Sequence, residues 1–148
     1  MSRRVFFSFH YQRDIFRVNQ IRSLPNMIGD AAAGFTDASL WEATKRQGDA
    51  AIKRLIDNGL IGTSVTVVCI GAATSGRTYV NYEIAESARR KNGLLGLRIN
   101  HLVGHDRSRD PHGPIPSLLT AYGAPIYTYT NAADLVGWIE KAATAAGR

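Results

Sequence analysis

The regular alternation of short apolar runs with longer amphipathic stretches is the feature that most constrains how this chain folds. The clearest apolar run is the β-branched segment TSVTVVCI at residues 63–70, which is typical of a buried strand. The clearest helical pattern is residues 49–60, where apolar side chains recur on one face. Strands separated by helices predict βαβ units and a parallel sheet.

The same pattern continues along the whole chain. We expect the first helix to begin with Asp14 as its N-cap. The expected strands are residues 5–9, 34–39, 63–70, 94–99 and 125–130. The expected helices are residues 14–24, 49–60 and 79–91, with a short optional helix at 117–122 and a last helix capped by Asn131.

Right-handed crossovers favour one doubly wound, flavodoxin-like arrangement of these elements. It is an α/β fold with a five-stranded parallel sheet of order 2-1-3-4-5 and helices on both faces. The length of 148 residues fits a single domain, residues 1–148. Ligands of such sheets bind beyond the carboxyl ends of the strands at the switch point, which here means the loops at residues 9–13 and 71–78.

Composition and charge limit the cellular compartment and the kinds of partner that we expect for this protein. The single cysteine, Cys69, cannot form an intramolecular disulfide, which fits a reducing compartment. The apolar run at residues 5–9 is too short for a signal peptide or a membrane span, so we expect a cytoplasmic protein without a membrane partner. The net charge of +6 favours anionic partners such as nucleotides. Because the basic residues are scattered, we do not expect nucleic-acid binding.

Several common uses of an α/β sheet are excluded by missing motifs. The chain has neither the GxxxxGK[ST] phosphate loop nor a GxGxxG motif after its first strand. No aspartate closes the expected third strand, as a phosphoacceptor site would need. His101, His105 and His112 indicate a polar surface loop, so we expect no metal site. Cys69 and Trp138 are interpreted as packing residues.

Three motifs then point to one family. They are RVFFSFHY at residues 4–11, ASLW at residues 38–41 and YVNYEI at residues 79–84. In this order the chain resembles, to about Ile99, the TIR-like proteins of the bacterial Thoeris anti-phage system, the ThsB family. The resemblance implies a TIR-like NAD-cleaving enzyme that releases nicotinamide and makes a cyclic ADP-ribose isomer. NAD would be the substrate, with no cofactor, and the product would activate a partner effector.

The resemblance also implies a catalytic glutamate, which falls on Glu83. In NAD-cleaving TIR domains an aromatic residue, usually Trp, precedes this glutamate by four residues, and here it is Tyr79. We expect Glu83 near the helix N-terminus, where the helix dipole would keep its carboxylate ionised. Position alone equally fits an ordinary solvated helix residue. Glu86 is a natural control, because it can pair with Arg89 or Arg90 on the helix surface.

One carboxylate suits this chemistry. Ordinary glycosidases need an acid to protonate a poor leaving group. Nicotinamide is already cationic in NAD and leaves as a neutral molecule, so no acid is required. What remains is to stabilise an oxocarbenium-like ribose with a fixed negative charge.

The remaining candidate site residues follow from their place beside the switch point. Each has an alternative role in packing or on a solvated surface. The candidate substrate-binding residues are Phe9, His10 and Tyr11 for stacking, Arg13 for the pyrophosphate, Trp41 as a stacking surface, Ser75 as a small polar residue, and Tyr79.

Two further partners are expected from the resemblance: a phage-derived trigger and a second copy of the chain. The segment from Ala38 to Gly48, which has no clear secondary-structure pattern, is the expected surface for self-association. The competing interpretation is a catalytically silent TIR-like module that binds proteins or senses nucleotides without turnover.

Overall fold

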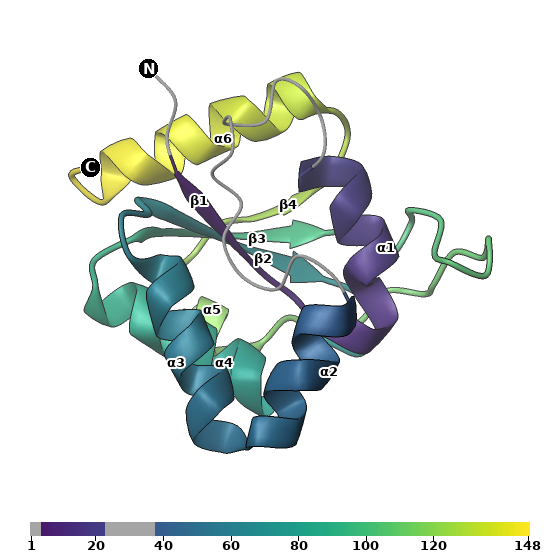
Figure 1. Cartoon of the computed structure of the whole chain (residues 1–148). Helices are drawn as coiled ribbons and strands as arrows, with labels where there is room; N and C mark the ends of the chain where they lie inside the picture. The colour runs from purple at the N-terminus through teal and green to yellow at the C-terminus, as the bar shows by residue number, and fades with distance from the viewer. Residues whose placement is uncertain (1–3, 23–37) are drawn as a thin grey trace.

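The described residues of the chain form an α/β structure around a parallel sheet of four strands (Figure 1). The structure, a computed structural model, describes residues 4–22 and 38–148. Within these ranges the strand order is β1-β2-β3-β4. The strands are β1 Val5–Ser8, β2 Val65–Ile70, β3 Gly93–Arg98 and β4 Ile126–Thr128.

Helices cover both faces of this sheet. Figure 1 shows α6 on one side, with α3, α4 and α5 on the other. The helices are α1 Tyr11–Arg22, α2 Ala38–Gln47, α3 Asp49–Leu60, α4 Thr78–Arg89, α5 Ser117–Ala121 and α6 Ala132–Ala145. Every residue of β1 and β2 is buried, as expected of parallel strands that are covered on both faces.

The predicted strands at residues 5–9, 63–70, 94–99 and 125–130 are confirmed to within two residues at each end. The helix predicted at residues 49–60 matches α3, and Asn131 caps α6 by accepting a hydrogen bond from the backbone N–H of Asp134. The order of the four strands agrees with the expected order once the predicted second strand is left out.

The predicted strand at residues 34–39 is not confirmed. Residues 34–37 lie outside the described residues, so the five-stranded order stays a prediction. Its last two residues, Ala38 and Ser39, were predicted wrongly, because they open α2. The whole segment from Ala38 to Gln47, which showed no clear pattern in the sequence, is helical. Gly48, with a φ of 99°, separates it from α3.

The first helix begins three residues earlier than the predicted start at Asp14. It starts at Tyr11, so Asp14 is an interior residue and not the N-cap. The Asp14 side chain is fully buried and pairs with Arg17, whose Nη1 lies 3.1 Å from an oxygen of the Asp14 carboxylate. The Asp14 carboxylate therefore takes part in a buried ion pair and does not cap the helix.

Two features of this fold place the site. Strands β1 and β2 are neighbours with Ser8 opposite Val68, so their carboxyl ends meet at one edge of the sheet. The loops that leave this edge lead directly into α1 and α4. Among the described residues, no helix is long and apolar enough to cross a membrane.

Candidate active site

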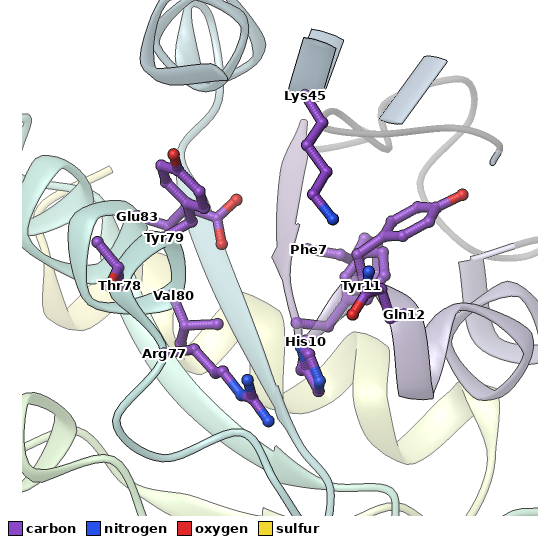
Figure 2. Close-up of a pocket in the computed structure, with 11 residues that line it drawn as sticks. Phe7, His10, Tyr11, Gln12, Lys45, Arg77, Thr78, Tyr79, Val80 and Glu83 are labelled. Carbon is purple, nitrogen blue, oxygen red and sulfur yellow. The ribbon is translucent and has the colours of Figure 1, made fainter. Parts of the chain in front are cut away.

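A cavity of about 250 Å³ lies beyond the carboxyl ends of β1 and β2, where the sequence places a ligand (Figure 2). Residues from β1, α1, α2 and α4 converge on it. Its lining residues are Phe7, Phe9, His10, Tyr11, Gln12, Lys45, Arg77, Thr78, Tyr79, Val80 and Glu83.

Glu83 is the acidic residue among those that line this cavity. It lies in the second turn of α4 and is only 6% exposed. Its carboxyl accepts a hydrogen bond of 2.6 Å from the Ser8 hydroxyl at the end of β1. Helix α4 therefore presents the carboxyl, and β1 fixes its position.

Burial dominates the protonation of this carboxyl. Loss of solvation raises the pKa of Glu83 to about 8, although the hydrogen bond from Ser8 opposes the shift. The expectation that the helix dipole keeps Glu83 ionised was therefore wrong. The dipole acts within the first turn of a helix, and Glu83 lies beyond that turn in an apolar setting.

Glu86 has the opposite environment one turn further along α4. Its carboxylate lies 2.8 Å from Arg89 and 3.6 Å from Arg90. The hydrogen bond from Arg89 lowers the pKa of Glu86 below its usual value. This is the surface pairing expected from the sequence, and it makes Glu86 a matched control for Glu83.

Tyr79 lines the cavity one turn before Glu83, as the spacing predicted. Its hydroxyl donates a hydrogen bond of 2.8 Å to Asp49, the first residue of α3. Because this contact orients the side chain, the tyrosine offers a positioned ring on the cavity wall (Figure 2).

The three predicted residues that follow β1 also line the cavity. The rings of Phe9 and Tyr11 lie 5.9 Å apart between centroids and are tilted by 31°. Burial, and then the positive charges of Arg77 and Arg13, lower the pKa of His10, so its imidazole is neutral at pH 7. The part of the cavity wall that follows β1, formed by Phe9, His10 and Tyr11, is therefore aromatic and uncharged.

Two predicted residues, Arg13 and Ser75, are not brought to this cavity, and the prediction for Trp41 falls outside the described part of the structure. Arg13 turns toward Asp110 instead, with Nε–Oδ2 and Nη2–Oδ1 distances of 2.8 and 3.0 Å. Ser75 lies in the turn before α4 and is not a lining residue. Trp41 belongs to α2, but its side chain lies outside the described part of the structure.

The sequence interpretation also missed several site residues. Ser8 had a signal, since it is a hydroxyl at the end of an otherwise apolar strand. Lys45 and Arg77 had none, because isolated basic residues are common on surfaces. The lining residues that were not predicted are Phe7, Gln12, Lys45, Arg77, Thr78 and Val80.

The residues assigned to packing or to the surface keep those places. Cys69 is fully buried, and burial raises the pKa of its thiol. Trp138 stacks on Tyr127 with ring centroids 4.4 Å apart. His101 bonds the backbone carbonyl of Tyr129 at 2.8 Å. Among the described residues, no group of three His, Cys, Asp or Glu side chains could hold a metal ion.

Residues 6–103 match the family model described as Thoeris protein ThsB, TIR-like domain. The chain belongs to this family. The matched residues contain the whole lining of the cavity, from Phe7 to Glu83.

A Bacillus cereus (strain MSX-D12) protein named "Putative cyclic ADP-D-ribose synthase ThsB1" is 47% identical over 117 residues. The alignment covers 76% of this chain but 61% of that relative, so this ThsB-family chain spans less than two thirds of the relative's length.

Proposed function

We propose that this ThsB-family protein cleaves NAD between nicotinamide and ribose as a signalling enzyme of anti-phage defence. The observation that carries the proposal is the buried Glu83 carboxyl, which Ser8 holds at a cavity lined by aromatic residues. Glu86 shows what a surface carboxylate looks like on the same helix, since it is paired with arginines and does not line the cavity.

The state of Glu83 suits a cationic substrate. A pKa of about 8 leaves the Glu83 carboxyl largely neutral at pH 7 when no positive charge lies beside it. A nicotinamide ring carries a positive charge, and an opposite charge nearby lowers the pKa of a carboxyl. Binding the substrate thus converts Glu83 into the carboxylate that the reaction uses.

The bond between nicotinamide and ribose then breaks with its electron pair moving to the ring nitrogen. Nicotinamide leaves neutral, and positive charge develops on the ribose. A carboxylate held in a poorly solvated cavity stabilises that charge far better than one in water. The hydrogen bond from Ser8 keeps this carboxylate in place. Phe9, Tyr11 and Tyr79 supply faces on which a cationic ring can stack.

We further propose that the product is a cyclic ADP-ribose isomer, as the name of the Bacillus cereus relative suggests. At about 250 Å³ the cavity is smaller than the roughly 300–1,000 Å³ of typical ligand pockets, so it would hold one end of the dinucleotide. A nucleophile from the other end, kept near the ribose carbon, competes with water through its high effective concentration.

The family also supports a role in a signalling chain. The cyclic product would diffuse to a partner effector, and a phage-derived molecule would trigger its synthesis. An enzyme that was always active would drain cellular NAD, so a silent resting state fits such a role.

Incubation of the purified protein with NAD tests this proposal, with extracts of infected and uninfected cells added in parallel. Chromatography follows nicotinamide, and mass detection identifies the second product. We expect nicotinamide in the infected extract and a product lighter than linear ADP-ribose by one water. Linear ADP-ribose throughout would contradict the cyclase. Binding of NAD without nicotinamide release in either extract would favour the silent, nucleotide-sensing module.

A further inference from the structure

Two basic side chains line the cavity besides the residues that the proposed reaction uses. Lys45 comes from α2, and Arg77 immediately precedes α4. Both residues are exposed. Figure 2 shows Lys45 extending into the cavity from one side and Arg77 reaching toward His10 on another.

Neither of these cations is neutralised by an acidic side chain within the described ranges. Arg77 uses its Nε to donate a hydrogen bond of 3.0 Å to the backbone carbonyl of Ala73, which leaves its outer nitrogens available. Lys45 has no carboxylate partner among the described residues. Glu83, the acidic lining residue, is buried and bonded to Ser8.

The nearby arginines of α1 show what a structural arginine looks like in this protein. Arg13 is paired with Asp110 at 2.8 Å, and Arg17 is paired with both Asp14 and Asp110. Those charges are already satisfied within the fold. Lys45 and Arg77 differ because their charge is directed at an open cavity.

The rest of the cavity wall supports a positive potential. His10 is neutral, in part because the charge of Arg77 disfavours its protonation. With Glu83 buried, the described residues that line the cavity include two exposed cations and no exposed carboxylate. A positive mouth does not attract a cationic nicotinamide ring by itself, but it attracts a phosphate ester.

We propose that Lys45 and Arg77 form the binding site for the diphosphate of a nucleotide, and so select diphosphate-linked nucleotides over nucleosides. Arg77 offers a planar fork that matches two phosphate oxygens, and Lys45 adds a mobile point charge from α2. This inference deepens the proposed function, because it names how NAD is oriented with its ribose against Glu83.

Isothermal titration calorimetry with ADP-ribose tests the site without depending on turnover, since ADP-ribose has no nicotinamide bond to cleave. The proteins are wild type, Lys45→Gln, Arg77→Gln and Arg46→Gln. Arg46 is an exposed neighbour on α2 that does not line the cavity, so its variant loses the same charge elsewhere. Adenosine, which has no phosphate, is titrated in parallel.

We expect Lys45→Gln and Arg77→Gln each to weaken ADP-ribose binding by about tenfold, as the loss of one charge-assisted contact does. Arg46→Gln should bind within about twofold of wild type, and adenosine binding should be the same for all four proteins. Thermal midpoints should also match, because the three replaced side chains are exposed.

The inference is overturned if wild type does not bind ADP-ribose, if either cavity variant binds as wild type does, or if Arg46→Gln loses as much affinity. The outcome of this binding experiment does not depend on whether the protein cleaves NAD. A protein that binds ADP-ribose through Lys45 and Arg77 but never releases nicotinamide would refute NAD cleavage and leave the diphosphate site standing.

Discussion

At the scale of single residues, Glu83 and Glu86 differ in environment although they lie three positions apart on α4. Glu86 faces two arginines at the surface, whereas Glu83 is enclosed and contacts Ser8. The enclosed carboxyl has a raised pKa and the surface carboxyl a lowered one. Carboxyls whose pKa values are pushed far from normal in a cleft are typical of functional sites.

The raised pKa of Glu83 predicts how the proposed reaction depends on pH. If the carboxylate is the active form, kcat/KM for NAD should rise about tenfold per pH unit below the pKa and level off above pH 8. The apparent pKa in kcat should be lower, because bound nicotinamide favours the charged form. Initial rates between pH 6 and pH 9.5 provide the measurement. A flat kcat/KM profile across this range would rule out the assignment.

The same pKa predicts that the folding stability of the protein depends on pH, which can be measured without any enzymatic activity. Between its unfolded value of 4.5 and about 8, Glu83 holds its proton in the folded state and loses it in the unfolded state. The contribution of Glu83 to the free energy of unfolding is therefore fully present below pH 4.5, and it is lost as the pH rises toward 8. The loss is at most about 5 kcal/mol, from about 1.4 kcal/mol per unit of pKa.

Glu83→Gln removes this titration and keeps a carbonyl oxygen for the Ser8 hydroxyl. We expect the variant to be more stable than wild type at pH 8.5 and nearly equal to it at pH 4.5. Urea unfolding at the two pH values measures the difference. An equal effect at both would mean that Glu83 is not a buried acid.

At the scale of elements, α1 is attached to the loop at residues 101–110 through one buried arginine. Arg17 donates hydrogen bonds to the backbone carbonyls of Leu102 and Ser108 at 2.9 and 3.1 Å. It also pairs with Asp14 and Asp110, at 3.1 and 3.2 Å. The residues of α1 that line the cavity are therefore held in part by a loop far away in sequence.

We expect Arg17→Met to destabilise the protein by about 3–5 kcal/mol, because it leaves the Asp14 carboxylate buried without its cation. Burial already raises the pKa of Asp14, with Arg17 as the main opposing group. Arg89→Gln breaks a surface pair on α4 and should leave the unfolding midpoint almost unchanged. Urea unfolding compares the two. Equal midpoints for the variants would show that Arg17 adds no stability beyond a surface pair.

The elements that the sequence predicted well are those with one strong local signal. Strand β2 is a run of buried, largely β-branched residues, and α3 has a clear apolar face. Helix α2 mixes small, polar and basic residues, so its pattern suggested no structure although it packs against α3. Asp14 was misplaced because a capping aspartate and a buried paired aspartate look alike in sequence.

At the scale of the whole molecule, the parallel topology made much of the site predictable. Glu83, Tyr79 and the three residues after β1 follow neighbouring strands, which must end at the same edge of the sheet. Lys45 could not be found in this way, because it depends on how α2 packs. Arg13 was misassigned because its partner, Asp110, lies in a distant loop.

Exposure of the cavity mouth predicts that assembly affects activity. Lys45, Arg77 and Thr78 are exposed lining residues, so water reaches the mouth in a single chain. A second copy that covers this mouth would exclude water and strengthen the effect of Glu83. We expect nicotinamide release per molecule to increase over about a hundredfold range of protein concentration, in step with a dimer or larger species by light scattering. Constant turnover per molecule across that range would contradict a role for self-association.

Nicotinamide release by Glu83→Gln and Glu86→Gln, compared with wild type under the condition that activates it, tests the central claim most directly. Both variants remove one carboxylate from α4, but only the first lies at the cavity. With folding verified by urea unfolding, Glu83→Gln should lose at least about 10²–10³ in rate, while Glu86→Gln should stay close to wild type. Wild-type activity in Glu83→Gln, or an equal loss in both variants, would contradict the account.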